Sequence, residues 1–483
     1  MNKLRKEKNS IPIHMAAFII CAAFYLFFAF RYGVYLGSDS AGYINMISAR
    51  EPVYPLFLAL FRKLFGQEHY LFAVIVFQNL LMAAAVTALC TYLKKRFELP
   101  YFIYAALFLT HFAEALLTQY AAKRAVVYTN SIMTEGITLS LWLIFMLMCF
   151  GIREKGLSLA EAGNVLIILL LCAFMTDVRK QMAMGYVTLF AVMFFDRKSF
   201  KKPGEHIRKT AILAAAMVLS LILALLGTGL YNYALRGTFA RNTRDMNLVL
   251  TTTLYVADRE DAGLIKEESV RELFLKTMDI LEETESNYRF AGKGLRELEE
   301  HYEDKYDVIT VNTTGPLFIE YAQEHGFKSG MEAEAEADRM SAVIVKSLLK
   351  DNAASYIRVY LASLINGFVN TIAARHRILD IYAMAAYIIF TALMVMCYRK
   401  EECYDAAVIG MSVLTAIVVN VGVTAALIFC QSRYMIYNMS LFYSAGLIML
   451  WSIIKNRREP VKSGPGITGR QVKVGNEECK KDT

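Results

Sequence analysis

Charged residues are scarce in this sequence. Asp, Glu, Lys and Arg make up 20% of its 483 residues and hydrophobic residues 56%, whereas an average soluble chain has about 25% charged and about 45–50% apolar residues. The apolar residues gather in runs such as 11–30 and 406–430, which are as long as membrane spans. This distribution excludes a single soluble enzyme and a disordered regulator. It predicts an all-helical, polytopic membrane protein.

Cysteine is missing from the one long polar stretch of the chain, residues 232–352. The eight cysteines lie in or beside apolar runs, apart from Cys479 in the C-terminal tail, and this placement argues against a secreted disulfide scaffold. No His, Cys and Asp spacing is typical of a metal cage. The pI near 8.9 does not indicate that the protein binds nucleic acid, because the basic loops that orient a membrane protein account for it.

The polar stretch is also acidic. Residues 232–352 hold 15 Lys and Arg against 24 Asp and Glu, so they carry a net charge of −9 while the rest of the chain carries +17. We interpret this stretch as a water-soluble insert between two membrane modules. Charged amphipathic helices are expected at 267–285, 293–305 and 331–350, with a loop at 313–316.

Ten apolar segments are expected to span the membrane. They are 11–30, 70–93, 100–117, 129–150, 163–176, 182–195, 212–230, 380–397, 404–430 and 434–454. The first is too long for a cleaved signal peptide and follows four lysines and arginines, so it is expected to remain as a span with a cytoplasmic N-terminus.

Basic loops decide the orientation of the spans. Placing the basic loops at 94–96, 153–155 and 197–209 in the cytoplasm puts the acidic insert outside and the basic tail inside. Segment 355–374 must then lie on the outer surface, because a span there would put the tail outside. It carries Arg358, and its apolar residues recur at helical spacing, which favours an interfacial amphipathic helix.

These assignments divide the chain into five parts. Residues 1–231 form an N-terminal membrane module with the first outer loop at 31–69, and residues 232–352 form the acidic, mostly helical extracytoplasmic insert. The interfacial helix occupies 353–378, the C-terminal membrane module 379–454 and the cytoplasmic tail 455–483. We expect a multi-pass protein of a bacterial plasma membrane, surrounded by membrane lipid, with both termini cytoplasmic.

Charged groups at the outer ends of spans are candidates for function, since it is energetically unfavourable to place a charged side chain in a membrane span. Five clusters are expected to meet on the outer face. They are Asp39 with Tyr43 and Tyr54 in the first outer loop; His111 and Glu114, with Lys123 and Arg124 beyond; Thr134 and Glu135; Asp177, Arg179 and Lys180; and Arg433 with Tyr434.

The pair Arg179 and Lys180 is informative, because basic residues on the outer side oppose the usual orientation rule. Either the topology is wrong at this hairpin or the two charges bind an anion. Asp177 is the alternative, internal partner. We favour anion binding, in which arginine supplies a bidentate fork for phosphate and lysine a point charge.

The first outer loop resembles that of the GT-C glycosyltransferases, which include protein O-mannosyltransferases and the aminoarabinose transferases that modify lipid A. The resemblance rests on GSDSAGY at 37–43, AR at 49–50, PVYPLFLAL at 52–60 and LFG at 64–66. It continues in FQNLL at 77–81, SIMTE at 131–135 and RY at 433–434. These landmarks cover about a third of the chain, and the acidic insert matches no family that we can name.

The resemblance implies an enzyme that transfers a sugar from a polyprenyl-phosphate donor to an extracytoplasmic acceptor by single displacement with inversion. It implies that Asp39 is the general base, with Glu135 or Glu114 as a second acid. The donor phosphate would bind Arg179, Lys180 and Arg433, with Lys123 and Arg124 as further candidates. Tyr43, Tyr54, Glu114 and Tyr434 would position the substrates, and no cofactor is required.

Three alternatives stay open at this point. Asp39 stands alone between Ser38 and Ser40, where the family often has two adjacent acids, so a divalent metal, which some relatives use, is possible but not indicated. Asp39 also suits the N-cap of a following helix. The chain could instead be a transporter or flippase of a lipid-linked saccharide, or an envelope glycan polymerase or ligase.

Overall fold

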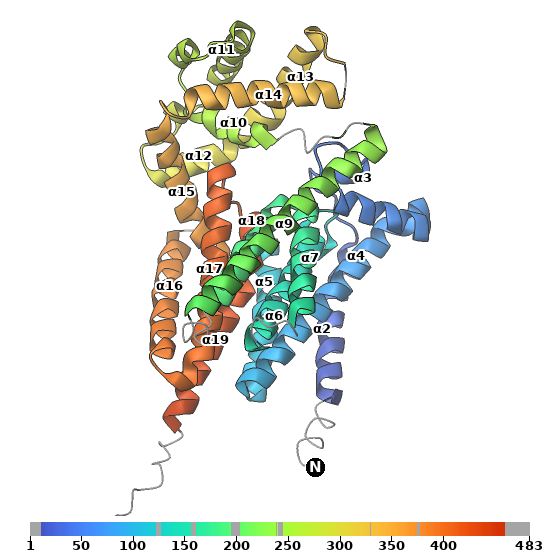
Figure 1. Ribbon diagram of the computed structural model, residues 1–483, viewed down its shortest axis with the longest axis vertical. Coiled ribbons are helices and arrows are strands. Elements are labelled where there is room, and N and C mark those ends of the chain that lie inside the picture. The colour runs from blue at the N-terminus through green and yellow to red at the C-terminus, as the bar shows by residue number, and fades with distance from the viewer. Residues whose placement is uncertain are drawn as a thin grey trace, which may run out of the picture.

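The computed structural model describes residues 11–121, 127–155, 161–194, 203–237, 239, 245–328, 330–373 and 377–458. In this part of the chain the secondary structure is helical, and one isolated bridge between Tyr35 and Ser131 is the nearest feature to a strand. Long helices form a bundle, and shorter helices form a cap at one end of it (Figure 1). The start of α2 and the end of α19 both lie at the opposite end of the bundle.

Seven helices of the described chain are long and apolar enough to cross a membrane, which confirms a helical membrane protein. They are α2 (Ile11–Tyr32), α4 (Val53–Phe97), α6 (Glu135–Lys155), α9 (Pro203–Arg236), α16 (Arg377–Tyr398), α17 (Tyr404–Leu427) and α19 (Met439–Arg458). Helices α5 (Tyr101–Ala121), α7 (Ala162–Val178) and α8 (Met184–Phe194) coincide with the other three expected spans. The count of ten spans stays a prediction.

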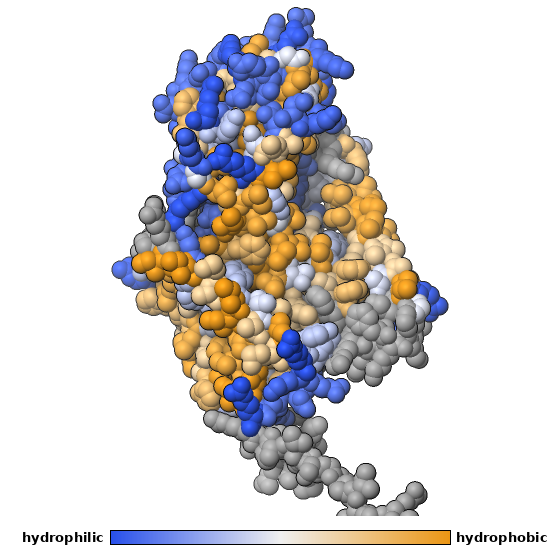
Figure 2. All heavy atoms as spheres, turned by 90° about the vertical axis from the view of Figure 1, so that its left-hand side faces the viewer, coloured by the Kyte–Doolittle hydropathy of each residue, from blue (hydrophilic) through white to orange (hydrophobic). Residues whose placement is uncertain are grey.

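The surface hydropathy separates the same two regions. In Figure 2 hydrophilic residues cover the cap, hydrophobic residues form a broad zone over the bundle beneath it, and hydrophilic residues return at the lower end. Helix α16 illustrates the zone, because Ile378, Ile381, Met384 and Ile388 are all more than 60% exposed. Side chains of this kind face lipid in a membrane protein, since lipid tails are as apolar as they are.

Helix α4 departs from the expected organisation. Its 45 residues include a kink at Gly66, whose φ of 75° lies in the left-handed region that glycine adopts without a Cβ clash. The limb before the kink, from Val53, runs across the long axis, and the limb after it is the expected second span (Figure 1). Residues 53–65 therefore belong to a helix, although the sequence placed them in the first outer loop.

The cap is the acidic insert, and it has a hydrophobic core of its own. It contains α10 (Asp245–Val256), α11 (Glu268–Glu283), α12 (Leu295–Asp307), α13 (Gly315–Glu324) and α14 (Met331–Leu348). Leu254, Phe274, Tyr302 and Ile344 are buried together in its centre. The three expected amphipathic helices are confirmed as α11, α12 and α14. The expected loop at 313–316 is wrong, because a π-helical segment, Val308–Thr314, continues into α13.

Helix α15 (Ala353–Ile372) connects the insert to the bundle. Val359 and Ala362 belong to the core of the insert, whereas Val369 and Ile372 belong to the core of the bundle. The helix packs on α12 and on α17. Ile357, Leu361 and Ile365 form an exposed apolar stripe at helical spacing. Whether this stripe lies on the membrane surface stays a prediction.

Candidate functional site

The segment that carries Asp39 is held against the start of α6. The hydroxyl of Ser40 donates to the carbonyl of Ile132 at 2.8 Å and accepts from the amide of Gly37 at 2.8 Å. Tyr35 exchanges backbone hydrogen bonds with the segment of Asn130 and Ile132. The loop therefore has a fixed position relative to Glu135, the first residue of α6.

Asp39 is part of an ion-pair cluster. Its Oδ1 accepts from Arg50 Nη2 at 2.8 Å and its Oδ2 accepts from Arg433 Nη2 at 2.7 Å. Arg433 lies in α18 (Ser432–Met435), just before α19. Asp39 is the N-cap residue of the short helix α3 (Ser40–Ile44), the position that its sequence suits, but its side chain makes no capping hydrogen bond there.

Glu135 extends this cluster. Its carboxylate lies 2.7 Å from Arg179 Nη1 and 3.2 Å from Arg433 Nε, and its side chain is 1% exposed. Arg179 also donates to the hydroxyl of Thr134 at 3.0 Å. The order Arg50, Asp39, Arg433, Glu135, Arg179 alternates in sign, so the five groups, called the arginine cluster below, carry a net charge of +1.

Burial and charge act in opposite directions on Asp39, which lies outside the helical spans. Burial alone raises the pKa of a carboxyl group, because it disfavours the charged form. The guanidinium groups of Arg433 and Arg50 outweigh burial and lower the pKa of Asp39 from 3.8 to about 2. Asp39 is therefore ionised at neutral pH.

Tyrosine rings support the arginines. The guanidinium carbons of Arg179 and Arg433 each lie 4.9 Å from the ring centroid of Tyr434, and the guanidinium of Arg50 lies 4.9 Å from that of Tyr43. Such cation–π contacts favour a cation on the face of the ring. Tyr43 in turn packs edge-on against Tyr54 at 5.2 Å. The three predicted positioning tyrosines thus lie in or next to the arginine cluster.

Two side chains that were not predicted also support the cluster. Gln181 accepts from Arg179 Nε at 2.9 Å, and its amide donates to the carbonyl of Tyr434 at 2.7 Å and to Asn420 at 2.6 Å. Gln78 accepts from the hydroxyl of Tyr54 at 3.0 Å. Buried polar residues in apolar spans are unusual. That signal would have found Gln78 and also Asn420, the residue that accepts from Gln181. Arg50 was noted in the sequence motif, but no role was assigned to it.

Other predicted residues lie elsewhere. Lys180 pairs with Asp245 of the insert, and both side chains are largely exposed. Glu114, in α5, accepts from the amide of Ser440 at 2.8 Å, so Glu135 and not Glu114 is the acid that shares an arginine with Asp39. His111 is fully buried in α5, and no hydrogen-bond partner is found for its ring in the described chain. Lys123 and Arg124 lie outside the described residues.

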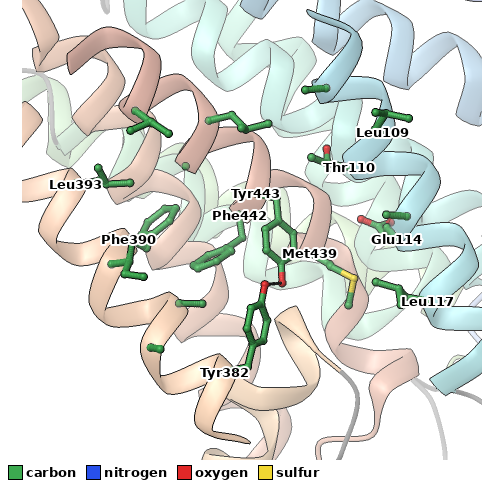
Figure 3. A pocket seen from close by; sticks show the side chains of 18 residues that line it. Leu109, Thr110, Glu114, Leu117, Tyr382, Phe390, Leu393, Met439, Phe442 and Tyr443 are labelled. Atoms are coloured by element: carbon green, nitrogen blue, oxygen red, sulfur yellow. Dashed lines mark hydrogen bonds between the residues drawn. The ribbon is translucent and has the colours of Figure 1, made fainter. Parts of the chain in front are cut away.

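An apolar groove lies between α5, α16 and α19 (Figure 3). Its volume is about 640 Å³, and leucine, phenylalanine and alanine side chains provide most of its walls. Its polar groups include Glu114, Thr110 and the hydrogen-bonded hydroxyls of Tyr382 and Tyr443, which are 2.9 Å apart. Met439, which lines the groove, follows Arg433 by six residues, which corresponds to about 10 Å of backbone in helical turns.

Within the described residues, no three His, Cys, Asp or Glu side chains form a group that could hold a metal ion. No family model, curated protein or solved structure matches the chain. The chemistry of the arginine cluster therefore has to be argued from its own geometry.

Proposed function

We propose that this chain is a membrane glycosyltransferase of the GT-C type, with ten spans and the insert outside a bacterial plasma membrane. It would transfer one sugar from a polyprenyl-phosphate donor to a cell-envelope glycan, lipid or protein. The observation that supports this most strongly is the placement of Asp39 beside Arg433 and Arg179. In this arrangement the carboxylate can accept a proton from the acceptor, and the two arginines, which share one tyrosine ring, can bind the phosphate of the donor in the same reaction.

The reaction would proceed by a single displacement. A hydroxyl or amine of the acceptor attacks the anomeric carbon of the sugar and loses its proton to Asp39. The bond from the anomeric carbon to the phosphate oxygen breaks, and its electron pair leaves with the phosphate. Arg433 and Arg179 stabilise the charge that develops there. The sugar is inverted, and polyprenyl phosphate is released.

The net charge of the arginine cluster suits this donor. A sugar linked to polyprenyl phosphate is a phosphodiester with one negative charge, which neutralises the cluster charge of +1. A pyrophosphate diester would leave one negative charge in excess in a largely buried site, which is unfavourable. Arg433 and Arg179 are 13% and 12% exposed, so their interactions with an anion are only weakly screened by water.

The apolar groove suits the donor's tail. An isoprenoid chain is uncharged and flexible, and the groove opens among exposed side chains such as Leu109 and Ile389 at the depth of the membrane. Met439 of the groove lies only six residues after Arg433, so one donor molecule would bind with its tail in the groove and its phosphate at Arg433.

A transporter of lipid-linked saccharide remains the second candidate. One observation favours it, namely the burial of the ionisable residues His111 and Glu114 within α5, because ionisable groups inside spans often mark transport pathways. A transporter would not release free polyprenyl phosphate from its cargo, so product analysis separates the two functions.

The test is sugar transfer by the purified full-length protein in detergent, with a panel of polyprenyl-phosphate sugars. We expect release of polyprenyl phosphate with the wild type and loss of release with Asp39→Asn. The matched control is Asp279→Asn, which removes an exposed carboxylate of the insert that pairs with Arg259. The control is expected to retain full activity. Equal turnover by all three proteins would exclude Asp39 as the base.

A further inference from the structure

Asp39 is engaged at both oxygens in the free protein. Arg50 occupies Oδ1 and Arg433 occupies Oδ2, at 2.8 and 2.7 Å, and the side chain is only 21% exposed. Two charge-assisted hydrogen bonds stabilise the ionised carboxylate and lower its pKa to about 2. A carboxylate in this state is a weak base near neutral pH, because an effective catalytic pKa lies close to the working pH.

Arg433 is engaged in the same way. Its Nη2 donates to Asp39 and its Nε lies 3.2 Å from Glu135, while its guanidinium lies over the ring of Tyr434. These nitrogens are the ones that a phosphate would use in a bidentate contact. A donor phosphate that binds through Nε and Nη2 would use the edge of the guanidinium that faces Asp39 and Glu135, so Asp39 and this phosphate compete for that edge.

The two carboxylates differ in how easily they can give way. Glu135 is 1% exposed, is held by Arg179 as well, and begins the long helix α6. Asp39 is partly exposed and lies in a loop, and it keeps Arg50 as a partner if Arg433 is withdrawn. An anion that binds this edge of Arg433 should therefore displace the more exposed Asp39 and leave Glu135 in place.

We infer that the donor's phosphate displaces Asp39 from Arg433, so that Asp39 becomes an effective base only when the donor is bound. This inference rests on the proposed function and adds an order to it: the donor must bind before the acceptor can be deprotonated. Arg433 then passes from one anion to another while Tyr434 and Glu135 hold it in place. Asp39 gains a free oxygen at the moment when the sugar is present.

Binding of polyprenyl phosphate without a sugar, measured at about pH 5 where its phosphate carries one negative charge as the donor's does, tests the competition. Wild type, Asp39→Asn and Asp245→Asn are compared in detergent at low salt. The Asp39→Asn substitution keeps the shape of the side chain but removes its charge, so the phosphate no longer displaces an ion pair and we expect at least about fivefold tighter binding. Asp245→Asn removes an exposed acid that pairs with Lys180, and we expect a change of less than about twofold.

The outcomes separate the inference from the proposed function. Unchanged or weaker binding by Asp39→Asn, with clear binding by the wild type, overturns the inference and leaves the lipid-phosphate site standing. Equal tightening in Asp39→Asn and Asp245→Asn also overturns it, because long-range charge would then explain both. No binding by any of the three proteins contradicts both the inference and the proposed function.

A second measurement uses only the wild type and so does not depend on how the variant folds. A water-soluble carbodiimide modifies protonated carboxyl groups, and mass spectrometry reports the yield at each residue. Polyprenyl phosphate should raise the modification of Asp39 several-fold and leave the exposed Asp279 unchanged. Unchanged or lower modification of Asp39 in the presence of bound lipid contradicts the inference.

Discussion

Replacing Arg433 by lysine tests the role of its planar fork while keeping the positive charge. The guanidinium contacts Asp39 and Glu135 through different nitrogens and lies over the ring of Tyr434. The ammonium group of lysine is a compact point charge and not a planar fork, so it can keep one of these three interactions but not all of them. Each charge-assisted hydrogen bond contributes about 1.5–3 kcal/mol, so the loss of one such bond is expected to lower kcat/KM for sugar transfer by about 10- to 150-fold.

The insert offers a matched control for this substitution. Arg339 also makes a two-nitrogen contact, with Glu267 and Glu336, but it lies at the surface of the insert with 47% of its side chain exposed. Arg339→Lys should leave kcat/KM within about twofold of the wild type, because exposed ion pairs contribute little. A value for Arg433→Lys that is also within about threefold of the wild type would refute the reasoning, since the fork would then have no function.

Three further predictions follow from the same geometry. Gln181→Ala should raise KM for the donor about tenfold, because Arg179 and the carbonyl of Tyr434 lose their shared support. The pKa of Asp39 is lower in the folded protein than in the unfolded chain, so its ionisation contributes about 2 kcal/mol to the free energy of unfolding above pH 4, and this contribution is lost as the pH falls toward 2. The thermal unfolding temperature of Asp39→Asn should therefore depend less on pH in this window than that of the wild type. Ala113→Phe narrows the apolar groove and should raise KM for a long-chain donor more than for a short-chain donor, and an equal effect on both would place the tail elsewhere.

The helices of the bundle could largely be predicted from the sequence. Apolar runs of span length determine the secondary structure almost alone in a membrane, since every backbone polar group must be satisfied within the segment. The limb of α4 before Gly66 was missed because its apolar residues were attributed to a loop motif. The kink itself depends on a left-handed φ, which a glycine permits but does not require.

The members of the arginine cluster were largely predicted, but their pairing was not. Asp39 and Arg433 are separated by 394 residues, and local sequence patterns contain no information about contacts at that distance. Charge at the ends of spans was enough to select Asp39, Glu135, Arg179 and Arg433. Which carboxylate meets which arginine depends on how α6, α18 and the first outer loop pack together.

Arg179 and Lys180 are neighbours in the sequence, but their side chains form ion pairs in different parts of the structure. Arg179 has an extended backbone, with φ of −159°, and Lys180 begins a short 3-10 helix. The change of conformation sends Arg179 to Glu135 and Lys180 to Asp245 of the insert. Sequence analysis treated the two as one phosphate-binding pair, because the direction of a side chain at such a junction cannot be deduced from residue type.

The most direct test of the central claim is sugar transfer by the wild type and by Asp39→Asn, measured as released polyprenyl phosphate. We predict release by the wild type and a loss of at least about 100-fold in the variant, which is the usual contribution of a general base. Equal release by both proteins would contradict the assignment of Asp39. Binding of the donor without release by the wild type, when acceptor-containing envelope extract is supplied, would contradict the transferase and favour the transporter.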